Sequence, residues 1–278
     1  MISSSFDYAR ATSLDDAIKR LAAAGRAAKL VAGGHSLVPL MKLRLSEPQA
    51  LIDIARIKAL SHIREHEGRI EIGATALHHV VATSKLLRTQ CPGVSDAAGE
   101  IGDPQVRNRG TVGGSLAHAD PAADYPAVML ALDAEIHVKG PKGWRVVRAD
   151  GFFQDLFTVD LAPDEIIANV QFAPAPVSAY AKLRQRASHY AIVGVAAALQ
   201  VSGGTIQSAR LGLTGGGPHA VRLPHVERAL AGQPLTQAVI ESVMGLPSEF
   251  STRDPLRIRT TICWTSVGTF VTAPKASR

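Results

Sequence analysis

The chain has 278 residues, of which 46% are hydrophobic and 19% charged, which is ordinary globular usage and excludes a disordered protein. No apolar run approaches the about 20 residues that span a bilayer, and the first ten residues show no signal-peptide pattern, so we expect a cytoplasmic protein without a membrane span. The 30 basic residues exceed the 24 acidic ones, but they are scattered and aromatics are only 5%, so nucleic-acid binding is not expected.

Strands and helices alternate in the first part of the chain. Ser13 and Asp16 are typical of a helix N-terminus, and the apolar residues after them recur at helical spacing. The strands on either side favour a small parallel sheet, and Gly68 marks the turn of a hairpin. We predict strands over 6–10, 29–31 and 51–54, helices over 14–24 and from Ser36, and a hairpin over 63–72.

The middle of the chain is predicted to be mixed. Residues 83–102 have a helical pattern that Pro92 interrupts, and the Gly-, Asp- and Asn-rich stretch after them is predicted to be a loop. Further on we predict a helix over 125–132, paired strands over 135–138 and 144–147, and a strand over 166–172.

The two prolines of Ala173-Pro174-Ala175-Pro176 have no backbone N–H to donate in a helix or a sheet, so we expect this segment to form neither. We therefore place a domain boundary there, with one domain over 1–175 and another over 176–278. In the second domain Gly203-Gly204 is predicted to join two strands of a meander. We expect strands over 179–183, 191–201 and 206–213 and helices over 221–230 and 235–244, which makes the fold class α+β.

Two glycine-paired loops carry the functional signal. Ala32-Gly33-Gly34-His35-Ser36 stands between a predicted strand and a predicted helix, where bare N–H groups can close on a diphosphate, although a simple tight turn fits too. The second loop, over 107–115, could present more donors to the same anion. We therefore expect side chains added at Gly33 and Gly114 to occupy the space of the diphosphate.

Asp124 closes the segment after the second loop. Its carboxylate could accept hydrogen bonds from polyol hydroxyls, or it could simply cap the following helix. Two such loops indicate a dinucleotide with a long ribityl-type linker. Neither contains Gly-x-Gly-x-x-Gly or a Gly-Lys-Ser/Thr phosphate loop, which argues against a Rossmann dehydrogenase and a P-loop NTPase.

At these residues the sequence resembles the FAD-binding medium subunit of carbon monoxide dehydrogenase and its relatives, the molybdenum hydroxylases, and the central domain of xanthine dehydrogenase. The resemblance rests on residues 32–36, on 101–115, which begin Ile-Gly-Asp-Pro-Gln-Val-Arg-Asn-Arg-Gly, and on 120–124. It continues through 164–167, 180–182 and 190–194. It implies an FAD-binding domain of two α/β subdomains (PCMH-type), over about 1–55 and 56–175, and a smaller domain with a three-stranded antiparallel sheet and helices.

The same resemblance implies a function. Electrons from a molybdenum centre on a large subunit would pass through [2Fe–2S] clusters on a small subunit to FAD on this chain, and then to a terminal acceptor, in a dimer of heterotrimers. The two cysteines, Cys91 and Cys263, are too few for a cluster of this chain's own. The FAD contacts that the resemblance implies are Ala32, Gly33, Gly34, His35, Ser36, Leu37, Ile101, Thr111, Gly113, Gly114, Ser115, Asp120, Asp124, Ile167, Lys182 and Tyr190.

Plainer interpretations remain for several residues. His35 could contact phosphate or merely pack, and Lys182 without the resemblance would be a solvated lysine. His62, His66, His78 and His79 form no recognisable metal spacing and are predicted to lie on the surface. Gly215-Gly216-Gly217-Pro218 is predicted to be a rigid turn leading into a helix rather than a phosphate cradle.

Two other functions stay open. One is a self-contained flavin oxidase or dehydrogenase, although no base signature accompanies the second domain. The other is a nucleotide-binding assembly module without redox activity. The segment Ser248 to Arg278, rich in Thr and β-branched residues, departs from the end expected of the family. We expect deletion of residues 252–278 to leave FAD bound but to lower stability or weaken contact with the partner subunits.

Overall fold

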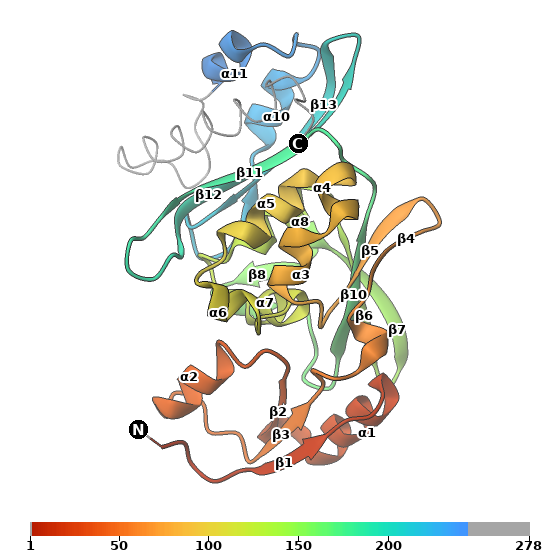
Figure 1. Ribbon diagram of the computed structural model, residues 1–278, viewed down its shortest axis with the longest axis vertical. Helices are drawn as coiled ribbons and strands as arrows, with labels where there is room; N and C mark the ends of the chain where they lie inside the picture. The colour runs from red at the N-terminus through yellow and green to blue at the C-terminus, as the bar shows by residue number, and fades with distance from the viewer. Residues whose placement is uncertain (1, 244–278) are drawn as a thin grey trace.

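The computed structural model describes residues 2–243, which form three bodies along the long axis of the molecule (Figure 1). The segment Ser248 to Arg278, which includes Cys263, lies outside the described residues. None of the helices within 2–243 is long and apolar enough to cross a membrane.

The first body is a three-stranded parallel sheet with α1 (Leu14–Ala24) packed on it. The N–H of Asp16 donates to the Ser13 hydroxyl at 3.1 Å, and Gly25 ends the helix at φ +60, so the predicted helix over 14–24 is confirmed. The parallel pairing is also confirmed. The strands, in the order β1-β3-β2, are β1 (Asp7–Arg10), β3 (Ala50–Asp53) and β2 (Ala28–Val31), and α2 (Leu37–Lys42) follows β2.

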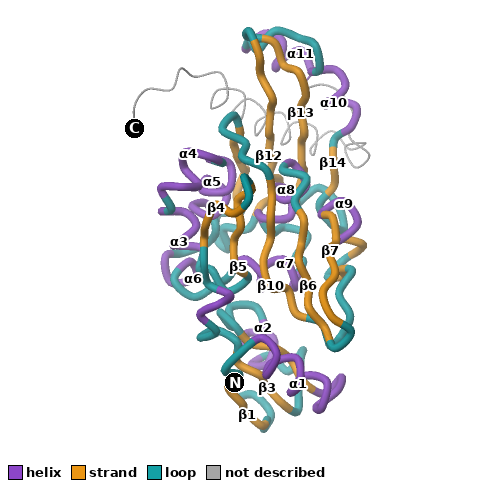
Figure 2. The backbone as a smooth tube through the Cα atoms, turned by 90° about the vertical axis from the view of Figure 1, so that its right-hand side faces the viewer, coloured by secondary structure: helices purple, strands orange, loops and turns teal. Residues whose placement is uncertain are grey.

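A five-stranded antiparallel sheet supports the second body (Figure 2). Its hairpin turns at Gly68 (φ +72), as predicted. The strand order is β4 (Ile63–His66), β5 (Arg69–Gly73), β10 (Ile166–Phe172), β6 (Glu135–Gly140) and β7 (Gly143–Arg148). A short pair, β8 (Phe153–Asp155) and β9 (Thr158–Val159), follows helix α9 (Ala149–Phe152).

Helices cover this sheet. The predicted interruption at Pro92 is confirmed, since this residue stands at the start of α5, where its missing N–H costs nothing. The predicted loop after Gly102 is wrong in part, because it contains two short helices, the second capped by Thr111. The helices are α3 (His78–Thr83), α4 (Lys85–Gln90), α5 (Pro92–Glu100), α6 (Pro104–Arg107), α7 (Val112–His118) and α8 (Asp124–Ala131).

The third body is an antiparallel sheet with four strands, not the three that were expected. Val221 and Arg222 pair with the preceding strand, so the helix predicted over 221–230 begins only at Pro224, and the turn at Gly215–Pro218 leads into a strand. The elements are β11 (Ser178–Arg184), β12 (Ala191–Ser202), β13 (Thr205–Thr214), β14 (Val221–Arg222), α10 (Pro224–Leu230) and α11 (Gln237–Val243).

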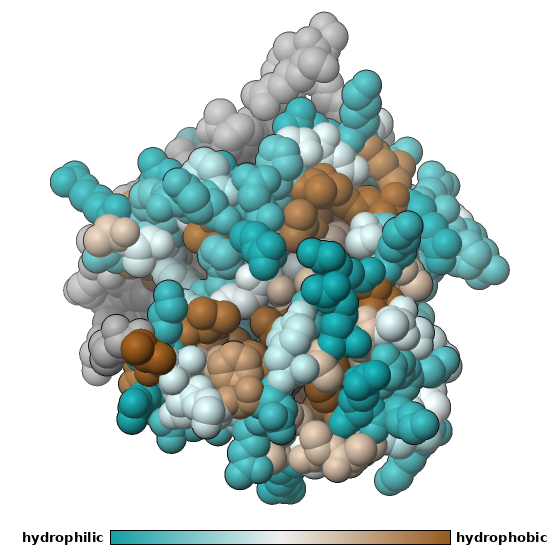
Figure 3. All heavy atoms as spheres, turned by 60° about the horizontal axis from the view of Figure 1, so that its bottom comes forward, coloured by the Kyte–Doolittle hydropathy of each residue, from teal (hydrophilic) through white to brown (hydrophobic). Residues whose placement is uncertain are grey.

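Each body has its own apolar core, and the cores share elements. Tyr180 and Ala196 of the C-terminal sheet join the core of the second body, where β11 to β13 lie against α5 and α8. Ile166 and Ala168 of β10 join the core beneath α1. On the end of the molecule formed by β1 to β3, separate groups of apolar residues lie between hydrophilic ones (Figure 3). The mixed α+β class is confirmed, and shared strands tie the three bodies together.

Candidate functional site

One cavity of about 980 Å³ lies where the first two bodies meet and extends to the loop between β11 and β12. It is lined by both glycine loops, although the 70 residues of 37–106 separate them in the chain. Of the sixteen residues singled out in the sequence only Lys182 is missing from its walls. The fifteen that line it are Ala32, Gly33, Gly34, His35, Ser36, Leu37, Ile101, Thr111, Gly113, Gly114, Ser115, Asp120, Asp124, Ile167 and Tyr190.

The first loop presents free main-chain donors to this cavity. Gly34 has φ +72, a left-handed conformation that glycine adopts at little cost. Within residues 2–243, the N–H groups of residues 33–37 donate to no other protein atom. Such a row of unpaired N–H groups is a typical anion-binding concavity.

The second loop behaves differently. The N–H of Gly113 donates to the carbonyl of Ala74 at 2.8 Å, and that of Gly114 to the Thr111 hydroxyl at 3.2 Å. These two N–H groups are therefore already paired within the protein, whereas the N–H of Thr111 donates to no atom of residues 2–243, so donors from the second loop stay a prediction. A Cβ on Gly113 would lie 2.5 Å from that of Ala74, so this glycine is needed for close packing of α7 against the segment after β5.

Gly33 is a point of close contact between the two loops. A Cβ built on it would lie 2.2 Å from the carbonyl oxygen of Arg109. A side chain there would collide with the second loop before it reached the cavity. The clash with Arg109 is therefore a second way in which a side chain at Gly33 could act, besides filling diphosphate space, and at Gly114 the added Cβ would meet Thr111 Oγ1 at 2.8 Å.

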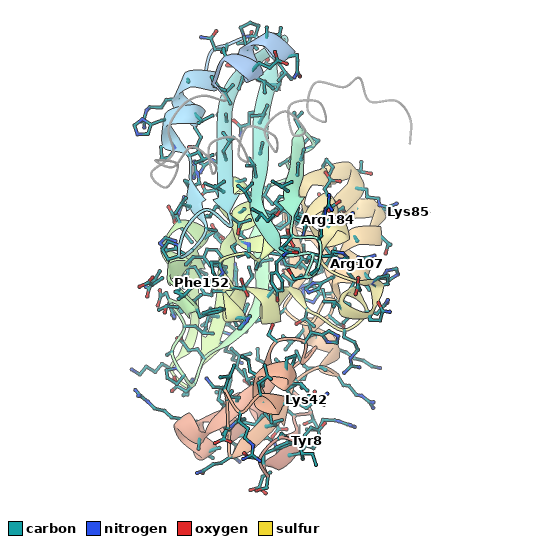
Figure 4. The ribbon with its side chains drawn as sticks, turned by 90° about the vertical axis from the view of Figure 1, so that its left-hand side faces the viewer. Tyr8, Lys42, Lys85, Arg107, Phe152 and Arg184 are labelled. Carbon is teal, nitrogen blue, oxygen red and sulfur yellow. The ribbon has the colours of Figure 1, made fainter. Side chains whose placement is uncertain are left out.

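Arg107 holds the rim of the second loop. Its guanidinium Nη1 donates to the carbonyls of Ile101, at 2.9 Å, and Gly102, at 2.6 Å. In Figure 4 it lies at mid-height among the helices of the second body, above the first body, where Tyr8 and Lys42 are labelled. Nearby, His189 Nδ1 lies 3.3 Å from the carboxylate of Asp103, which connects the rim to the loop that carries Tyr190.

Asp124 lies at the base of the cavity and is 5% exposed. Its carboxylate accepts hydrogen bonds from the Tyr180 hydroxyl, at 2.5 Å, and from Lys182 Nζ, at 3.0 Å. Burial raises its pKa, against the lowering effect of Lys182. It does not cap α8, and the Lys182 side chain has no exposed surface, so both plain interpretations of these residues are wrong.

His78 was predicted to be a surface residue, but it is 5% exposed and lines the cavity. Burial lowers its pKa to about 4, so the ring is neutral at pH 7. Its Nδ1 has no partner among the described residues, and its ring lies 5.3 Å from that of Tyr125. His78 lies on the same buried face of α3 as Val81, three residues later. This spacing is typical of one face of a helix and was visible in the sequence.

Arg145 positions another wall that the sequence did not reveal. From β7 it donates to Glu165 at 2.7 Å and to Asp160 at 3.1 Å, and the N–H of Ala162 also donates to Glu165. These contacts raise the pKa of the guanidinium and lower that of Glu165. They hold the segment over 161–165, which lines the cavity.

Comparison with known proteins decides the family. Residues 4–175 match the model of the FAD binding domain in molybdopterin dehydrogenase, and residues 178–256 match that of the CO dehydrogenase flavoprotein C-terminal domain. The chain belongs to the FAD-binding medium subunits of the molybdenum hydroxylases. It is an oxidoreductase subunit whose cofactor is FAD.

Individual medium subunits are similar over most of their length. The carbon monoxide dehydrogenase medium chain of Hydrogenophaga pseudoflava is 38% identical over 245 residues, covering 87% of this chain and 85% of that one. The 6-hydroxypseudooxynicotine dehydrogenase complex subunit alpha of Paenarthrobacter nicotinovorans is 39% identical, with 84% and 80% covered.

Solved structures have the same fold. Carbon monoxide dehydrogenase from Hydrogenophaga pseudoflava matches with a TM-score of 0.86 at 36% identity, over 96% of each chain. Quinoline 2-oxidoreductase from Pseudomonas putida 86 matches with a TM-score of 0.88 at 27% identity, over 98% of this chain and all of that one.

The cavity of this FAD-binding medium subunit suits its cofactor. Its volume lies at the upper end of ordinary ligand pockets, as a dinucleotide requires. The unpaired N–H groups of the first loop can hold an anion, and Asp124 offers acceptors for hydroxyl groups. Apolar Ile101 and Ile167 offer surface to an aromatic ring.

Proposed function

We propose that this chain carries FAD in the cavity between its two glycine loops and passes electrons from the [2Fe–2S] clusters of a small partner subunit to a terminal acceptor. The observation that carries this proposal is the row of unpaired N–H groups at residues 33–37, at the wall of a cavity large enough for a dinucleotide. FAD, when bound, supplies the redox chemistry.

The protein's own residues divide the work of holding it. The first loop would bind the diphosphate with Gly33, Gly34, His35 and Ser36, while the second loop supports the first by contact with Gly33. Asp124 would accept from the ribityl hydroxyls and Tyr190, 44% exposed, would lie beside the flavin ring. The remaining contacts, Ala32, Leu37, Ile101, Thr111, Gly113, Gly114, Ser115, Asp120, Ile167 and Lys182, would complete the site or support it.

The partners in this proposal are the small iron–sulfur subunit and a large molybdenum-cofactor subunit, in a dimer of heterotrimers within the cytoplasm. The names of the relatives support a multi-subunit enzyme, since they are called medium chains and complex subunits. Residues 2–243 contain no group of His, Cys, Asp and Glu side chains that could hold a metal ion. The proposed scheme places the clusters on the small subunit.

The test uses the purified complex and a matched pair of variants, Gly34→Val and Gly204→Val. Both glycines have left-handed backbones, at φ +72 and +75, but only Gly34 lines the cavity. We expect the complex with Gly34→Val to keep its clusters, lose FAD and lose reduction of the terminal acceptor, while the complex with Gly204→Val keeps all three. Full acceptor reduction by a flavin-free complex would overturn the proposal.

A further inference from the structure

The wall of the cavity formed by residues 120–124 is held from outside, by the C-terminal sheet. Asp120, Ala123 and Asp124 line the cavity. The N–H of Gly215 donates to the carbonyl of Pro121 at 2.8 Å, and that of Ala191 to the carbonyl of Ala122 at 3.3 Å. The segment that presents Asp124 thus takes its support from strands β12 and β13.

Thr214, the last residue of β13, makes the most enclosed of these contacts. It is 0% exposed, and its hydroxyl lies 2.9 Å from the carbonyl oxygen of Pro121 and 2.8 Å from that of Ala123. A hydroxyl has one proton to donate, so the two carbonyls share it. Without it, the Ala123 carbonyl, directly before Asp124, would lose this partner in a buried place.

The neighbouring strand is shaped to admit this arrangement. Gly194 on β12 pairs with Thr214, and a Cβ there would lie 2.9 Å from Thr214 Cγ2 and 2.2 Å from the Tyr180 hydroxyl. The missing side chain makes room for both residues. Tyr180 then reaches the Asp124 carboxylate while Thr214 reaches the main chain beside it.

We propose that Thr214 is a positioning residue of the cofactor site, whose hydroxyl fixes the carbonyls of Pro121 and Ala123 and so sets the direction in which Asp124 enters the cavity. This inference rests on the proposed placement of FAD. It makes tight cofactor binding depend on one hydroxyl of the C-terminal sheet that lies outside the cavity.

The test compares Thr214→Val, which keeps the shape and removes the hydroxyl, with Thr214→Ser, which keeps the hydroxyl and removes the methyl group. Thr205→Val, at the other end of β13, is the matched control. The full chain is purified with any subunits that accompany it. The FAD dissociation constant, the visible circular dichroism of bound flavin and the thermal midpoint of the flavin-free protein are measured for each variant.

We expect Thr214→Val to weaken FAD binding on the order of tenfold and to alter the flavin dichroism, because the buried carbonyls of Pro121 and Ala123 lose the hydroxyl donor that they share. Thr214→Ser should restore both values, and Thr205→Val should match the wild type. If Thr214 serves packing alone, Thr214→Ser will be the more damaging variant and the dichroism of bound flavin will not change in either, which would overturn the inference.

Gly34→Val separates this inference from the proposed function. If Gly34→Val loses FAD while Thr214→Val binds it as the wild type does, the role of Thr214 is refuted and the cavity assignment stands. If Gly34→Val binds FAD normally, the cavity itself is wrongly assigned and the inference fails with it.

Discussion

The hydroxyl of Tyr180, in strand β11, lies 2.5 Å from the carboxylate of Asp124, the first residue of helix α8, although the two residues are 56 positions apart. Lys182, two residues further along β11, supplies the counter-charge on the same side. A carboxylate this deeply buried is tolerated only with such partners, so the C-terminal sheet and helix α8 depend on each other.

Lys182→Met should therefore destabilise the protein strongly. Removal of one partner of a buried ion pair typically costs about 3–5 kcal/mol, because the other charge remains uncompensated. Urea unfolding of the flavin-free protein measures this. Lys139→Met removes a more exposed pair with Asp15 and should cost less than about 1 kcal/mol. Equal losses in the two variants would contradict the buried pairing.

Gly33→Ala should separate the two glycine loops. Its Cβ would collide with the backbone of Arg109, and such overpacking costs about 1–3 kcal/mol. We expect both lower stability and loss of FAD. Gly99→Ala is the control: it has open space in helix α5, and should stabilise by about 0.5–1 kcal/mol. Normal stability with FAD loss in Gly33→Ala would restore direct obstruction of the cofactor as the explanation.

His78 should make stability depend on pH. Its pKa is lowered in the folded protein from 6.5 to about 4, so the unfolded chain binds the proton first as the pH falls. The contribution of neutral His78 to the free energy of unfolding is fully present above about pH 6.5. It is lost as the pH falls from there to about 4, by roughly 3 kcal/mol. Unfolding curves of His78→Gln should lack this part of the slope, and those of its exposed neighbour His79→Gln should retain it.

Tyr190→Ala should change reoxidation of reduced flavin more than it changes FAD affinity. The side chain lines the cavity yet is 44% exposed, so it can control access to a bound ring without anchoring the phosphates. Stopped-flow reoxidation and FAD titration give the two values. An unchanged reoxidation rate together with lost flavin would show that Tyr190 anchors the cofactor instead.

Local signals in the sequence predicted much of the fold. The cap at Ser13, the hairpin at Gly68 and the break at Pro92 each depend on residues within one or two turns of each other, and each was found where predicted. The first turn of α7 was missed because its glycines are typical of loops. Thr111 caps that helix, and Gly113 is there to pack against Ala74.

The candidate site, like the fold, was predicted where local residues decide and missed where distant contacts decide. The motifs indicated the residues of the cavity, but which N–H groups are free is decided by distant partners such as Ala74 and Ala76. The burial of His78 and the clamp of Arg145 on Glu165 likewise depend on strands and helices far apart in the chain. The spacing of residues along the sequence does not predict such long-range contacts.

The core of the first body can be completed only after strand β10 has been synthesised. Ile166 and Ala168 complete the apolar core beneath α1, whose other strands end at Asp53. During synthesis at about 5–20 residues per second, roughly ten seconds pass between the two segments. The first body must wait that long on the ribosome with part of its core uncovered, and a nascent chain halted before residue 166 should be a target for chaperones.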